Sequence, residues 1–110
     1  MKTQALIAAS RLRDLRSNAM TSGSESVAAI DVQRRSIEFS DGIAPVLFSK
    51  SIELNVTGAD SEKRAPGIAG VRFFPNGSST GATIDLKMEG QAYEIRINWL
   101  TGRVSTASIE

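Results

Sequence analysis

The chain has 110 residues, 41% of them hydrophobic, and thirteen basic against twelve acidic side chains give a formal net charge of +1. This length supports one hydrophobic core, so we expect a single domain over 1–110, and the near balance of charge excludes a strong general attraction to nucleic acid or anionic lipid. Cysteine and histidine are both absent, which excludes disulfides, thiolate sites and histidine-based acid–base or metal chemistry.

The first predicted element is an α-helix over about 3–20, before a β-rich region over about 25–109. The helical segment lacks Pro and Gly and is rich in Ala, Leu and Arg, which favour helices. Thr3 is a candidate N-cap, and Gly23 lies just beyond the expected end. Apolar residues recur at spacings of three and four and form one stripe, which needs a partner surface. They are Ala5, Ala8, Leu12, Leu15 and Ala19.

Four residues of this helix are candidate contacts with another protein. Leu6 and Ala9 lie beside the apolar stripe, and Arg13 and Arg16 lie mostly off it, on a wetter surface. We expect the stripe itself to pack on the chain's own sheet.

Alternating apolar and polar residues after Gly23 predict a series of β-strands. The segment 58–70 is polar and broken by Pro66 and Gly67, so we expect a mobile loop there. The aromatic residues Phe73, Phe74, Tyr93 and Trp99 fall in strand patterns and are expected in the core. A helix followed by antiparallel strands predicts an α+β fold. The predicted strands cover 25–31, 36–39, 51–57, 83–88, 91–99 and 103–109.

The run Gly77-Ser78-Ser79-Thr80-Gly81 is the strongest candidate for chemistry. Its glycines would let backbone N–H groups converge on an anion, but a phosphate loop needs a Lys and a Ser or Thr that open a helix, and here a strand pattern follows. As nucleophiles, Ser78 and Ser79 lack a histidine base, which leaves Lys87 or Lys50 as alternatives. We expect a structural bend in which the hydroxyls bond the local backbone.

Two other binding hypotheses start from charged side chains. Asp60 and Glu62 offer calcium ligands but lack the spacing of an EF-hand loop, so we expect a solvated loop. Arg11, with Arg13 and Arg16, could contact phosphates along the helix, but the aromatic residues that would stack on bases are expected in the core. The residues therefore favour neither a metal nor nucleic acid.

Two motifs in the last third of the chain point to a known family. "VRFFPNGSSTGATIDL" carries an R-F-x-x-x-G-S-S-x-G pattern followed by Ile, and "YEIRINWLTGRV" ends in W-L-T-G-R. Over 71–104 the chain resembles the H-type minor pseudopilins of bacterial type II secretion. Ala82 departs from the second glycine usual in that pattern, so the backbone there is expected to differ slightly. The matching positions include Arg72, Phe73, Gly77, Ser78, Gly81, Trp99, Gly102 and Arg103, to which we assign a structural role.

The resemblance implies a pilin-like head, with an N-terminal helix packed on antiparallel sheets. It implies a non-enzymatic assembly subunit, without cofactor or small-molecule substrate, near the tip of the periplasmic pseudopilus that helps folded proteins cross the outer membrane. The implied partners are other minor and major pseudopilins. A minor pilin of type IV pili that binds DNA is the alternative, and a hydrolase using Ser78 or Ser79 is a distant third.

Members of this family begin with a cleaved leader and an apolar membrane-spanning helix. The apolar run at residues 5–9 is too short to span a bilayer. We therefore expect that Met1 starts a truncated form and that residues 3–20 are the lower half of a longer helix. The native protein would then be held in the inner membrane with its head in the periplasm, whereas this chain alone would be soluble.

Overall fold

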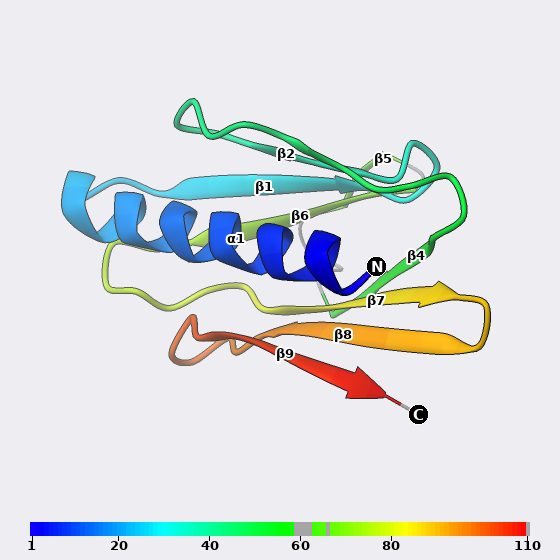
Figure 1. Cartoon of the computed structure of the whole chain (residues 1–110). Helices are drawn as coiled ribbons and strands as arrows, with labels where there is room; N and C mark the ends of the chain where they lie inside the picture. The colour runs from blue at the N-terminus through cyan, green and yellow to red at the C-terminus, as the bar shows by residue number, and fades with distance from the viewer. Residues whose placement is uncertain (59–62, 66, 110) are drawn as a thin grey trace.

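A computed structural model describes residues 1–58, 63–65 and 67–109, with residues 63–65 described by their backbone alone. Over these residues the chain forms one helix, α1 (Lys2–Ser22), and then nine strands in two sheets (Figure 1). The strands are β1 (Ser26–Asp31), β2 (Ser36–Phe39), β3 (Val46–Leu47), β4 (Glu53–Thr57), β5 (Lys63–Ala65), β6 (Ile68–Phe73), β7 (Ala82–Met88), β8 (Gln91–Ile97) and β9 (Val104–Ile109).

The two sheets share no strand. The first has the order β3-β2-β1-β6-β5, and the second has the order β4-β7-β8-β9. All described pairings are antiparallel. The predicted α+β fold, with one N-terminal helix packed on antiparallel sheets, is therefore confirmed.

Helix α1 is the element that joins the two sheets. It contacts β1, β3 and β6 of the first sheet and β8 and β9 of the second, and it lies lengthwise across both in Figure 1. Most of its buried residues are alanines, whose short side chains let the helix approach the strands closely. The fully buried residues are Ala5, Ala8, Ala9, Leu12, Leu15 and Ala19, which contain the predicted stripe and add Ala9 to it.

The predicted end of α1 is confirmed, but its predicted start is wrong. Gly23 adopts a left-handed conformation with φ 70°, and its N–H donates to the carbonyl of Ala19, so the predicted glycine stop is confirmed. The predicted Thr3 cap is wrong, because the helix already begins at Lys2 and Met1, at the N-cap, makes no side-chain capping bond. No helix in the described part of the chain combines the length and apolar character needed to cross a bilayer.

The strands bury alternate residues beneath the helix. In β7, Ala82, Ile84 and Leu86 are buried, while the residues between them are partly exposed. β1 shows the same alternation, with Ala28 and Ile30 in the core. This period of two is the pattern that predicted these strands.

The predicted loop over 58–70 is wrong where the structure describes strands. β5 covers 63–65, and β6 already begins at Ile68, with a turn at Gly67 that has φ 80°. β6 also pairs with β1, where Ala29 lies opposite Gly70. The edge strands of the first sheet were missed because β3 has only two residues and β5 three, too few to show a period. Asp60 and Glu62, the calcium hypothesis, lie outside the described residues.

Candidate assembly interface

Three segments that are far apart in sequence meet beside the C-terminal half of α1. The guanidinium of Arg16 donates from Nε to the carbonyl of Gly77 at 2.9 Å and from a terminal nitrogen to the carbonyl of Thr101 at 2.9 Å. Thus a helix side chain holds both the loop between β6 and β7 and the hairpin between β8 and β9. We call Arg16, Gly77, Thr101 and Gly102 the Arg16 junction.

Two glycines lie at this junction, where the loop approaches the backbone of the hairpin and the side chain of Arg16. Gly102 has φ 71°, and a Cβ there would overlap the Gly77 carbonyl oxygen. Gly77 has φ 92°, and a Cβ there would lie 2.8 Å from a terminal nitrogen of Arg16. A larger residue at Gly102 would therefore have to displace the loop or the hairpin, whereas at Gly77 it would displace the Arg16 guanidinium and strain the backbone.

The third motif glycine lies where the same loop crosses the hairpin. A Cβ at Gly81 would lie 2.9 Å from Cβ of Trp99, and Gly81 has φ 79°. Beside it, the N–H of Ser79 donates to the carbonyl of Trp99 at 2.9 Å. Ala82, where the resemblance led us to expect a slightly different backbone, lies in β7 and does not have the positive φ that would favour glycine.

The serine hydroxyls of this loop are engaged locally. Ser79 is buried, and its Oγ accepts a hydrogen bond from the N–H of Gly81 at 3.0 Å. Oγ of Ser78 donates to Oδ1 of Asn76 at 2.7 Å. Within the described residues no lysine or carboxylate forms a hydrogen bond with either hydroxyl. The loop then enters β7 and not a helix, so the geometry is that of a bend and lacks the helix start of a phosphate loop.

The hairpin between β8 and β9 displays two large apolar side chains at its tip. Trp99 is 66% exposed and Leu100 is 65% exposed. The turn beneath them is ordered by Asn98, whose Oδ1 accepts from the N–H of Leu100 at 2.9 Å and of Thr101 at 3.1 Å. The prediction that Trp99 belongs to the core is wrong, because β8 ends at Ile97 and the alternation stops there.

The remaining motif residues lie around this hairpin and loop. Phe73 is fully buried, as expected. The guanidinium of Arg72 pairs with the carboxylate of Glu25 at 2.8 Å, and the N–H of Arg72 donates to the hydroxyl of Thr80 at 3.0 Å. Arg103 is exposed, and its carbonyl accepts the N–H of Asn98 at 3.0 Å, which closes the turn.

The four candidate contacts on α1 are not equivalent. Leu6 is 44% exposed and is free to meet a partner. Ala9 is fully buried in the chain's own core, so its expected partner contact is corrected: it lies on the sheet side of the helix. Arg13 donates to the carbonyl of Val104 at 2.9 and 3.2 Å, so both it and Arg16 first serve to hold their own chain. Sequence reasoning missed the half-exposed Ile7 and Met20, which interrupt the polar side of the helix.

The three helix arginines do not form a continuous basic track. Arg11 donates to the carbonyls of Ala44 and Pro45, at 3.3 and 2.7 Å, before β3. Arg13 and Arg16 instead reach the opposite sheet and the loop that leads to it. Each arginine therefore anchors a different segment, and a phosphate backbone running along the helix would not meet them as a row.

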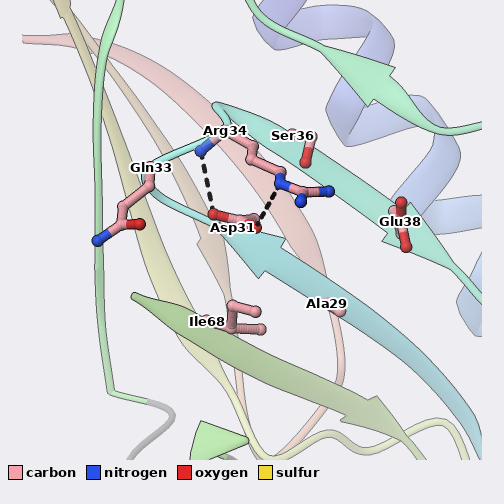
Figure 2. A pocket seen from close by; sticks show the side chains of 7 residues that line it. All are labelled: Ala29, Asp31, Gln33, Arg34, Ser36, Glu38 and Ile68. Carbon is pink, nitrogen blue, oxygen red and sulfur yellow. Dashed lines mark hydrogen bonds and ion pairs between the residues drawn. The ribbon is translucent and has the colours of Figure 1, made fainter. Parts of the chain in front are cut away.

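Two surface hollows are each lined by several charged side chains. One, of about 550 Å³, is lined by Arg13, Arg16, Ser17, Thr101, Arg103 and Val104. The other, of about 410 Å³, lies on the outer face of the first sheet, and Figure 2 shows its lining of Ala29, Asp31, Gln33, Arg34, Ser36, Glu38 and Ile68.

Two of the charged residues that line the hollow in Figure 2 pair with each other within one turn. Oδ1 of Asp31 accepts the N–H of Arg34 at 3.0 Å, and Oδ2 lies 3.9 Å from Nε of the same arginine. The two opposite charges therefore partly neutralise each other within one turn. Among the residues that the structure describes, no group of three or more acidic side chains is placed to hold a metal ion.

Comparison with known proteins identifies relatives of this chain. No family model matches the sequence. The chain is 30% identical over 101 residues to type II secretion system protein H of Xanthomonas campestris pv. campestris, a match that covers 92% of this chain and 59% of that protein. The chain thus spans about three fifths of the length of this curated relative.

The fold is similar to those of solved pilin-like proteins. The minor pseudopilin EpsH of the Vibrio cholerae type 2 secretion system superposes with a TM-score of 0.77 at 17% identity, over 97% of this chain and 95% of that one. The type IV minor pilin FimU of Pseudomonas aeruginosa superposes with a TM-score of 0.68 at 14% identity, over 100% and 98% of the two chains. These likenesses confirm the pilin-like fold. By sequence the chain is therefore similar to a type II secretion system protein H, and by fold it is similar to minor pseudopilins and a type IV minor pilin.

Proposed function

We propose that this chain is the head of a non-enzymatic assembly subunit that acts near the tip of the type II secretion pseudopilus in protein export across the outer membrane. The observation that carries the proposal is the hairpin tip, where Trp99 and Leu100 are about two thirds exposed on an ordered turn. Exposed aromatic and aliphatic side chains on a fixed support are typical centres of protein–protein interfaces.

The proposed partners are other minor and major pseudopilins. The half-exposed Leu6 and Ile7 on the outer side of α1 offer a second apolar contact. With the hairpin tip they would let one head meet two neighbours, as subunits of a helical filament must. We propose that the native protein is held at the inner membrane and that its head faces the periplasm.

A catalytic role is not part of this proposal. The sequence has no histidine or cysteine to act as base or thiol nucleophile. Ser78 and Ser79, the candidate nucleophiles, use their hydroxyls in hydrogen bonds within the loop. A structural subunit accounts for these residues without further assumptions.

The proposal is tested by secretion in cells that lack the chromosomal gene and carry the full-length protein on a plasmid. The double variant Trp99→Ser and Leu100→Ser should export substantially less protein than the wild type while being produced at the same level. The control is Leu47→Ser, which removes another exposed apolar side chain, 72% exposed on β3, away from the hairpin. Normal secretion by the hairpin variant would argue against the tip as an assembly contact. Normal secretion without the gene, together with loss of DNA uptake, would favour the type IV pilin alternative.

A further inference from the structure

The hollow of about 550 Å³ beside the Arg16 junction is lined by three arginines. Arg13 and Arg16 come from α1, and Arg103 comes from the hairpin between β8 and β9. The ion pairs of the described residues join other side chains, and none of these three arginines has a carboxylate partner among them. Three like charges around one hollow repel each other, so a negative ligand would relieve this repulsion.

Two of the guanidinium groups are already fixed in place. Arg13 is held by the carbonyl of Val104, and Arg16 is held by the carbonyls of Gly77 and Thr101. A guanidinium carries five N–H donors, and these bonds use only some of them. The remaining donors would bind a ligand with little further loss of side-chain entropy.

Arg103 differs from the other two arginines. Its side chain makes no hydrogen bond or ion pair with the described residues. It is exposed at the rim of the hollow. All of its side-chain donors are therefore available, and its removal should not disturb the fold.

We infer that this hollow binds the carboxylates of an acidic segment on a neighbouring subunit. The inference rests on the proposed function, to which it adds the chemistry of the partner. Guanidinium groups bind carboxylates through paired, charge-assisted hydrogen bonds. The exposed Trp99 and Leu100 on the same hairpin would add apolar contacts, as expected for a protein ligand.

Nucleic acid fits this hollow less well than an acidic protein segment. None of the residues that line it is aromatic, so the hollow itself offers no stacking surface, and Trp99 beside it could stack with one base. Arg11 points to the other sheet, and the net charge of the chain is only +1. A small, isolated group of arginines matches a few carboxylates and not an extended phosphate backbone.

The other hollow provides a matched control. Arg34 lines it and is exposed, but its charge is paired with Asp31 in the same turn. Arg34 belongs to the turn between β1 and β2, whereas Arg103 belongs to the hairpin at the opposite end of the molecule (Figure 1). Arg34→Glu and Arg103→Glu therefore change the net charge equally at two distant places.

The first experiment measures binding of a fluorescent hexaglutamate peptide to the purified chain by anisotropy at low salt. We expect Arg103→Glu to bind at least about tenfold more weakly than the wild type, and Arg34→Glu to bind within about twofold of it. Added salt should weaken the wild-type complex because it screens the charges. No binding by the wild type, or equal loss in both variants, would overturn the inference. Tighter, Arg103-dependent binding to a DNA duplex would overturn it in favour of nucleic acid.

The second experiment separates this inference from the proposed function. The purified heads of the other pseudopilins of the same organism are tested for binding to the wild type and to both variants. The inference is supported if Arg103→Glu no longer binds one of these heads while Arg34→Glu still binds it. Equal binding to all three proteins overturns the inference and leaves the proposed function intact. If the wild type binds none of the heads, even as full-length subunits in a membrane, this would count against the proposed function itself. The peptide experiment would then still decide whether the hollow binds carboxylates.

Discussion

Nε of Arg16 donates a hydrogen bond of 2.9 Å to the carbonyl oxygen of Gly77, 61 residues further along the chain. The same side chain reaches Thr101 in the next hairpin. Arg16 therefore helps to fix how the glycine loop and the exposed hairpin lie relative to each other, together with the hydrogen bond from Ser79 to Trp99. The following predictions test this arrangement and the surface that depends on it.

Replacing Arg16 should destabilise the domain. Arg16→Ala leaves the carbonyls of Gly77 and Thr101 without their charged donor, and we expect the free energy of unfolding to fall by about 2–3 kcal/mol. Urea denaturation followed by circular dichroism measures this change. Arg34→Ala, at an exposed turn, should change it by no more than about 0.5 kcal/mol. Equal effects of the two substitutions would mean that the junction adds no stability.

Gly102 should tolerate no side chain, whereas Gly90 should tolerate one at a modest cost. Both residues have positive φ, 71° and 80°, so alanine is strained by about 1 kcal/mol at either position. At Gly102 the new Cβ also overlaps the Gly77 carbonyl oxygen, while at Gly90 nothing lies within 4 Å. Gly102→Ala should therefore lower the free energy of unfolding by at least about 2 kcal/mol more than Gly90→Ala. Similar denaturation midpoints for the two variants would refute the close approach.

Trp99 is the single tryptophan of the chain, so its fluorescence reports on the hairpin tip. Because its side chain is 66% exposed, we expect an emission maximum close to that of tryptophan in water and efficient quenching by acrylamide. Binding of a pseudopilin head at the tip should shift the emission to the blue and reduce quenching. Weak quenching of the free chain would restore the original expectation of a buried Trp99.

Substitutions on the two sides of α1 should separate stability from assembly. Ala9→Leu adds volume to a fully buried position, and we expect a loss of about 1–3 kcal/mol in the free energy of unfolding. Leu6→Ser, at a position that is 44% exposed, should change stability by about 0.5 kcal/mol or less and weaken binding to a neighbouring head. Thermal unfolding and a pull-down with partner heads measure the two effects. A stable Ala9→Leu variant with reduced partner binding would return Ala9 to the interface.

The regular elements could be predicted because their signals are local. The helix showed its stripe of Ala and Leu and its glycine stop, and the segments of β4 and β7 showed alternating apolar and polar residues. β5 and the start of β6 were missed because their pairing depends on each other and on β1, which lies about 40 residues earlier. The polar composition of this segment and Pro66 therefore predicted a loop, whereas the strand pairing can be seen only in the folded chain.

The candidate interface was only partly predictable for a related reason. Helical spacing places Arg13 and Arg16 beyond the apolar stripe, but it does not reveal the carbonyl groups that bind them. Ala9 was misplaced because a helix that packs between two sheets buries a wider face than one sheet would cover. Trp99 was misplaced because the alternation of apolar and polar residues in the sequence continues for two residues beyond Ile97, where β8 ends. The glycine motif named the right residues, but only the structure shows that Gly77 and Gly102 touch.

The position of α1 across two sheets that share no strand has a mechanical consequence. A pulling force applied along the helix would be divided between both sheets, through Arg11 toward the first and through Arg13 and Arg16 toward the second. Bonds loaded side by side resist such tension together, whereas bonds loaded one after another would open in turn. In the proposed assembly role, tension along α1 would therefore be carried by both sheets at once.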